Sequence, residues 1–69
     1  MGKIRRGGYV FEWWIGDHPP LHIHVSDSNG KILGRVRLDT KTSIDDWKAP
    51  RKVIEIIEEL QQSGRIENP

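Results

Sequence analysis

Hydrophobic residues recur at every second position in three segments of the first half of the chain. These segments are residues 9–15, 21–25 and 31–38, and Asn29-Gly30 lies between the last two. Alternation of this kind is typical of β-strands with one buried face, and an Asn-Gly pair between two such runs is a strong hairpin signal. The pattern therefore predicts a three-stranded antiparallel meander.

The alternation also assigns each strand residue to a face of the sheet, because successive side chains point in opposite directions. On this basis the inward face carries Tyr9, Phe11, Trp13, Ile15, Leu21, Ile23, Val25, Ile32, Gly34, Val36 and Leu38. The polar alternates of the same strands then point to the other face.

From Arg51 the hydrophobic period becomes that of a helix. Pro50 suits the first turn, where its missing N–H costs nothing, and Gly64 can end the helix in the left-handed conformation. The apolar stripe at positions i, i+3, i+4 and i+7 consists of Val53, Ile56, Ile57 and Leu60. Such a helix should cover the apolar side of the sheet.

The expected architecture is therefore one α+β domain over residues 8–66, with the C-terminal helix packed on one face of the meander. Residues 1–7 are interpreted as a basic N-terminal arm and residues 67–69 as a tail. In the polar connection between sheet and helix, Ile44 and Trp47 are the expected anchors.

Composition narrows the classes of protein. The chain has 69 residues and no cysteine, which excludes a disulfide scaffold, a thiolate metal site and a cysteine-dependent enzyme. No apolar run approaches a membrane span or follows the basic N-terminus as a secretory signal would, so we expect a cytoplasmic protein. Residues 1–37 carry six basic against three acidic residues, and residues 38–69 carry five against seven. This asymmetry points weakly to a polyanionic partner.

The face that the helix would leave uncovered carries residues that burial does not explain: Glu12, Trp14, His22, His24, Arg35 and Arg37. His18 would join them from the rigid corner at Pro19-Pro20. Arginine neutralises phosphate, an exposed indole stacks on an unpaired base, and histidine serves as acid or base near neutral pH. This combination suits binding and metal-free cleavage of RNA.

The roles expected for these residues follow from that chemistry. His18, His22 and His24 are the candidate catalytic groups, oriented by Asp17 and Glu12. The candidate nucleic-acid contacts are Trp14, Lys31, Arg35 and Arg37. In this mechanism one of His22 and His24 takes the 2′-hydroxyl proton, the other or His18 protonates the leaving oxygen, and Arg35 and Arg37 hold the phosphate.

Other interpretations of the same residues stay open. His-x-His on a strand suits chelation of one divalent metal such as zinc, which His18 could complete as a three-histidine site with an open position. The histidines and arginines could also form a solvated strand face. A non-enzymatic module, in which the sheet face or edge docks another small protein, is the competing class of function.

The segment Asp17-His18-Pro19-Pro20-Leu21-His22-Ile23-His24-Val25 resembles the motif of a small bacterial family of unknown function, the DhiT-like domains. Some members of that family are described as toxins of type II toxin–antitoxin pairs. The resemblance extends to the preceding aromatic strand, the arginine-rich strand and the C-terminal helix, over most of residues 8–66. Leu21 departs from it, because a second motif proline is common there.

The resemblance implies that Asp17, His18, His22 and His24 are functional positions and that a small cognate antitoxin-like protein binds the chain. Together with the residue chemistry, it leads us to expect a toxin-like protein acting on RNA or another nucleic acid, without a cofactor. A half-covered sheet also invites a second gene product as a covering partner, and a homodimer is a further expectation.

Overall fold

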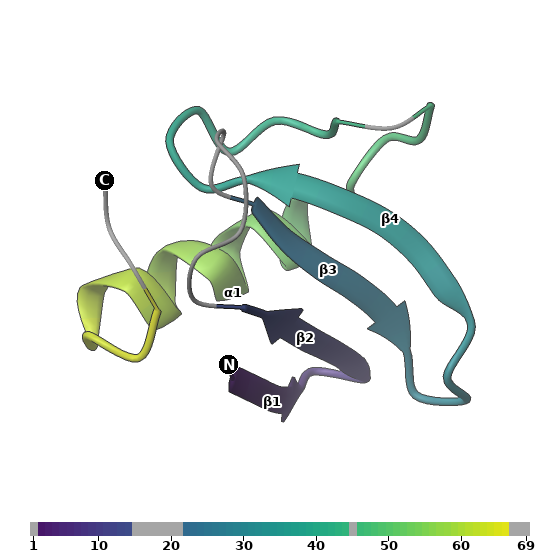
Figure 1. Cartoon of the computed structure of the whole chain (residues 1–69), viewed down its shortest axis with the longest axis horizontal. Coiled ribbons are helices and arrows are strands. Elements are labelled where there is room, and N and C mark those ends of the chain that lie inside the picture. Colours follow the sequence, from purple (N-terminus) through teal and green to yellow (C-terminus); the bar gives the residue numbers. More distant parts are fainter. Residues whose placement is uncertain (1, 15–21, 45, 67–69) are drawn as a thin grey trace.

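The computed structural model describes residues 2–14, 22–44 and 46–66. Its elements are β1 (Gly2–Arg6), β2 (Tyr9–Trp13), β3 (His22–Asp27), β4 (Ile32–Arg37) and α1 (Arg51–Gln62). The strands form one antiparallel sheet in the order β1-β2-β3-β4. Figure 1 shows α1 lying across one face of this sheet. The α+β class is confirmed, with the helix on one face.

The predicted three-stranded meander is wrong, because the segment interpreted as a basic arm forms the fourth strand. Gly7 and Gly8 connect β1 to β2, and both have positive φ, 64° and 85°. Positive φ at both central residues is the requirement of the two-residue type I′ hairpin turn. The Gly-Gly pair is thus a hairpin turn rather than the end of an arm.

The hydrophobic pattern did not predict β1, because a glycine and an arginine occupy two of its three inward positions. Exposure alternates along the strand, with Lys3 and Arg5 exposed and Gly2, Ile4 and Arg6 half-buried. The Trp13 indole fills the space beside Gly2, where a Cβ atom would overlap it. A strand with one inward aliphatic residue therefore still packs against the domain.

The hydrophobic core lies between α1 and the inward face of β2, β3 and β4. Phe11, Ile23, Val25 and Val36 are fully buried there. All four members of the predicted helix stripe are also buried there: Val53, Ile56, Ile57 and Leu60. Ile66, which follows the end of the helix, joins the same core. No helix in the described part of the chain is long and apolar enough to cross a membrane.

The end of α1 confirms the predicted glycine stop. Gly64 has φ 77°, its N–H bonds to the carbonyl of Gln61 at 3.1 Å, and the Arg65 N–H bonds to the carbonyl of Leu60 at 3.0 Å. This pair of bonds is the Schellman motif, which satisfies carbonyls that the helix leaves open. The turn brings Ile66 back into the core.

A β-bulge in β4 corrects the predicted direction of Ile32. Val25 lies opposite Gly34 but Ser26 lies opposite Ile32, so Leu33 is an extra residue on β4. An extra residue breaks the alternation locally. Ile32 therefore leaves the predicted core face and is 77% exposed, while Leu33 packs against the core.

The connection between β4 and α1 covers part of the outer edge of β4. Backbone bonds join Arg37 N–H to the Thr42 carbonyl at 2.8 Å and Ile44 N–H to the Arg35 carbonyl at 3.0 Å. Trp47 packs against the core as expected; its indole lies beside Gly34, and its Nε1 donates to the Arg35 carbonyl at 3.1 Å. These contacts hold the C-terminal half of β4 in place.

Candidate functional site

A row of directly opposed residues crosses all four strands on the face turned away from α1. Lys3 lies opposite Glu12, Glu12 opposite His24, and His24 opposite Arg35. Opposed residues of antiparallel strands point to the same face, with Cβ atoms about 4.5–5.5 Å apart. We call Lys3, Glu12, His24 and Arg35 the central row; it consists of an ammonium, a carboxylate, an imidazole and a guanidinium in that order.

Two histidines and a tryptophan form a ring cluster over this row. The ring centroids of His22 and His24 are 5.0 Å apart, with an interplanar angle of 58°. The Trp14 ring meets that of His24 edge-on at 4.7 Å and 88°. Trp14 is 40% exposed, so this aromatic residue is partly accessible to solvent beside the imidazoles.

The burial of the intervening residues explains why both imidazoles point outward. Ile23 and Val25 are fully buried under α1, and on a strand this turns His22 and His24 to the opposite face. The two rings therefore lie side by side on one face, as the alternation predicted. Both are half-buried.

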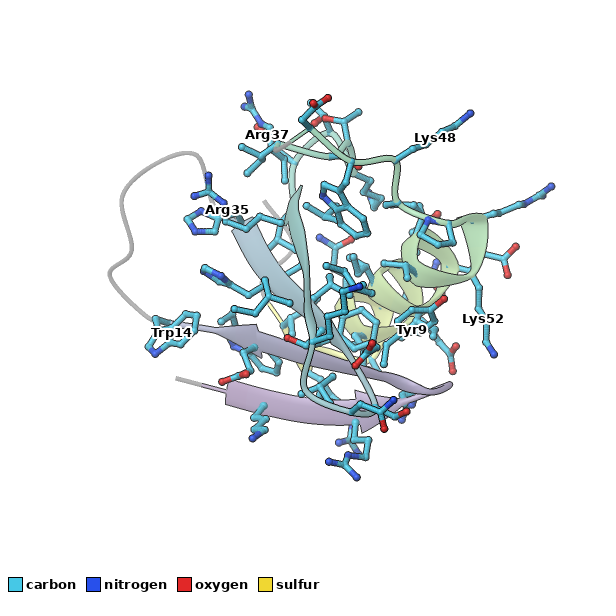
Figure 2. The ribbon with its side chains drawn as sticks, turned by 90° about the vertical axis from the view of Figure 1, so that its right-hand side faces the viewer. Tyr9, Trp14, Arg35, Arg37, Lys48 and Lys52 are labelled. Carbon is cyan, nitrogen blue, oxygen red and sulfur yellow. The ribbon has the colours of Figure 1, made fainter. Side chains whose placement is uncertain are left out.

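The other candidate residues of this face lie on β2 and β4. Figure 2 shows Trp14 and Arg35 on the side of the sheet away from α1, and Tyr9 and Lys52 on the helix side. The described elements place no second layer over this side of the sheet. We call it the open face.

Arg37 lies opposite His22 across β3 and β4, but its guanidinium is engaged by a residue that the sequence reasoning missed. Its Nε donates to Asp39 Oδ1 at 3.0 Å, and its Nη2 donates to Oδ2 at 2.7 Å. The Arg37 hydrogen bond lowers the pKa of Asp39 to about 2, and the same bond raises the pKa of Arg37. The spacing Arg-x-Asp at the end of a strand is the signal that could have revealed this pair.

The pair changes the expected role of Arg37. Two N–H groups along one side of its fork already bind a carboxylate, so only its remaining N–H groups are left for a phosphate. Both arginines lie directly opposite a histidine of the ring cluster, Arg35 opposite His24 and Arg37 opposite His22.

One predicted site residue, Lys31, is not brought to the ring cluster, and two others fall outside the described part of the chain. Lys31 lies in the turn between β3 and β4, where its N–H donates to Asp27 Oδ1 at 2.9 Å. It is four residues from Arg35 of the central row, which corresponds to about 13 Å along a strand. Asp17 and His18 lie outside the described residues.

The three-histidine metal site also depends on His18. Within residues 2–14, 22–44 and 46–66, no group of three or more His, Cys, Asp or Glu side chains is arranged to hold a metal ion. The structure therefore describes two of the three proposed ligands, His22 and His24, and the third, His18, lies outside the described residues.

Two cations that the sequence reasoning left in the arm belong to the open face. Lys3 is part of the central row, and Arg5 lies opposite Val10 in the next outward-facing position of β1. The Gly7-Gly8 pair was the available signal, because it is a recognised two-residue hairpin turn.

Comparison of the chain with models of known protein families, with curated proteins and with solved structures gave no match.

Proposed function

We propose that the protein binds single-stranded RNA on its open face and cleaves it by metal-independent acid–base catalysis. The observation that carries this proposal is the ring cluster. Two imidazoles with centroids 5.0 Å apart lie beside an accessible indole, and Arg35 lies directly opposite His24. These are a base, an acid, a stacking surface and a cation within one small area.

Binding would use the indole and the guanidinium. Single-stranded nucleic acid is held by aromatic rings that stack on unpaired bases and by cations that contact phosphates. Trp14 supplies the ring and Arg35 the charge. A base stacked on Trp14 would place an adjacent phosphate near the two histidines.

Cleavage would use the histidine pair. One neutral imidazole removes the proton of a 2′-hydroxyl, and the 2′-oxygen forms a bond to the adjacent phosphorus. The bond from phosphorus to the 5′-oxygen breaks, and that oxygen takes a proton from the second, protonated imidazole. The products are a 2′,3′-cyclic phosphate and a 5′-hydroxyl, and Arg35 stabilises the negative charge that develops on phosphate.

The experiment compares histidine variants on a labelled, unstructured RNA in the presence of EDTA. The parent protein should produce fragments ending in cyclic phosphate, and an all-deoxy version of the same strand should be bound but not cut. His22→Ala and His24→Ala should each lose about 10²–10⁴-fold in rate. Lys48→Ala, which alters an exposed residue on a different side of the molecule (Figure 2), should retain the parent rate.

The outcomes separate this function from its competitors. Equal cleavage by the two histidine variants and the parent would overturn the catalytic assignment. Cleavage that requires added zinc would favour the metal site instead. If the parent neither binds nor cuts RNA, the proposed function is refuted; in the competing docking module there would be no turnover, and the histidine variants would change only the affinity for a small partner protein.

A further inference from the structure

We propose that Lys3 and Arg5 of β1 form a second phosphate-binding subsite, so that a single RNA strand crosses the open face from β4 to β1. This inference rests on the proposed RNA binding and extends it. It assigns a binding role to residues outside the histidine motif and to the strand that the hydrophobic pattern did not reveal.

The first support is the direction of the β1 side chains. Lys3 and Arg5 are exposed, and their intervening neighbour Ile4 packs against the core. Arg6 points to the other face of the sheet, where its Nη1 lies 3.4 Å from Oε1 of Glu59 in α1. Two of the three cations of β1 therefore point to the open face, and the third points to the helix.

The second support is the spacing of the cations across the sheet. Lys3 and Arg35 occupy the two ends of the central row, three interstrand steps or about 14 Å apart at about 4.8 Å per step. A single phosphate group spans only a small part of this distance. A strand lying across the row, however, would meet Arg35 with one phosphate and Lys3 with another.

The third support is the carboxylate between them. Glu12 lies in the central row between Lys3 and His24, and its negative charge disfavours a phosphate at that point. Phosphates are therefore favoured on the two sides of Glu12, which divides the open face into a β4 subsite at the histidines and a β1 subsite at Lys3 and Arg5. Glutamate can instead accept a hydrogen bond from a base amino group.

The test measures the binding of 2′-O-methyl oligonucleotides, which cannot be cleaved, by a variant carrying Lys3→Gln and Arg5→Gln. Glutamine keeps a polar outward side chain on β1. The matched control carries Lys48→Gln and Lys52→Gln, which remove the same charge away from the open face (Figure 2). Both variants are first compared with the parent by thermal unfolding and circular dichroism.

For an octanucleotide, the β1 variant should lose affinity about tenfold, and the control should stay close to the parent. The slope of log K against log salt should fall by about 1.4 in magnitude, because each phosphate that is no longer neutralised lowers it by about 0.7. For a dinucleotide, which has one phosphate, the β1 variant should bind like the parent. The exchange Lys3→Arg with Arg5→Lys should restore octanucleotide binding.

Two results would overturn the subsite. The first is that the β1 variant binds the octanucleotide as tightly as the control variant does. The second is that the β1 variant loses as much affinity for the dinucleotide as for the octanucleotide. If the double variant unfolds early, the single substitutions Lys3→Gln and Arg5→Gln decide, because the subsite requires each of them to lower the magnitude of the salt slope by about 0.7. Failure of the parent to bind any oligonucleotide would instead refute the proposed function itself, so the two failures are distinct.

Discussion

The guanidinium of Arg37 binds the carboxylate of Asp39 along one edge, through hydrogen bonds of 3.0 and 2.7 Å. Removing the guanidinium by Arg37→Ala should raise the pKa of Asp39 from about 2 toward its ordinary 3.8. The measurement is an NMR titration of the Asp39 carboxyl carbon. A substitution outside this pair, Asp27→Asn, is the control and should leave the Asp39 titration unchanged.

The same pair determines how stability depends on pH. The pKa of Asp39 is lower in the folded state, so ionisation of this carboxylate favours folding. Its contribution is fully present above the unfolded pKa near 3.8 and is lost as pH falls through the folded pKa of about 2. Arg37→Ala should therefore remove part of the change in unfolding free energy between pH 4 and pH 2. Identical pH profiles for parent and variant would refute this role.

The β1–β2 turn gives a second prediction. Gly8 has φ 85° and no atom lies within 4 Å of where its Cβ would be, so a substitution there acts through backbone strain alone. Gly8→Val should destabilise the hairpin by about 1–2 kcal/mol, because L-residues disfavour positive φ. Gly8→Asn should cost less, since asparagine tolerates this region better.

Hydrogen exchange of the β1 amides distinguishes the two variants. Protection of the Ile4 and Arg6 amides, which face β2, should fall in Gly8→Val and stay near the parent level in Gly8→Asn, while α1 stays protected in both. Equal protection of β1 in the two variants would mean that the turn geometry does not hold the fourth strand.

The parts of the fold that the sequence predicted are those in which apolar spacing alone determines the structure. Ile23 and Val25 alternate with the two histidines, so their burial directs both imidazoles outward. The helix stripe and the Gly64 stop were equally visible, because each follows from a single local rule. The outward half of the candidate site depended on the same alternation and was therefore predictable.

The missed features depend on contacts between distant residues. β1 packs through Gly2 against Trp13, a contact in which the apolar surface belongs to the neighbouring strand. Ile32 is turned outward by a bulge that only the pairing of β3 with β4 reveals. The binding of Arg37 by Asp39, by contrast, is local, and the Arg-x-Asp spacing could have revealed it.

Gln61 gives a third prediction, on stability. It is 5% exposed, and its Nε2 donates to the Leu38 carbonyl at 3.0 Å, joining α1 to the end of the sheet. Gln61→Leu should lower the free energy of unfolding by about 1–3 kcal/mol, because a buried carbonyl loses its donor. The neighbouring Gln62 is exposed, so Gln62→Leu should change stability by less than about 0.5 kcal/mol. Urea unfolding measures both; equal effects would contradict the role of this bond.

Trp14 provides the most direct test of base stacking on the open face. Trp14→Ala should weaken binding of a non-cleavable single-stranded RNA by about 1–3 kcal/mol, the contribution of one stacked base. Trp14→Phe should retain most of the affinity, since a ring remains. Arg35→Lys, which keeps the charge and leaves the ring, should show a smaller loss than Trp14→Ala.

Fluorescence then identifies which indole meets the RNA. Trp13 packs beside Gly2 and Trp47 beside Gly34, whereas Trp14 is 40% exposed. A stacked base should therefore quench Trp14 more than the other two, and Trp14→Phe should abolish the quenching that RNA causes. Trp47→Phe should keep it, because that indole lies on the core side of the sheet. Quenching that survives Trp14→Phe would place the bound strand elsewhere and remove the stacking surface on which RNA recognition by the ring cluster depends.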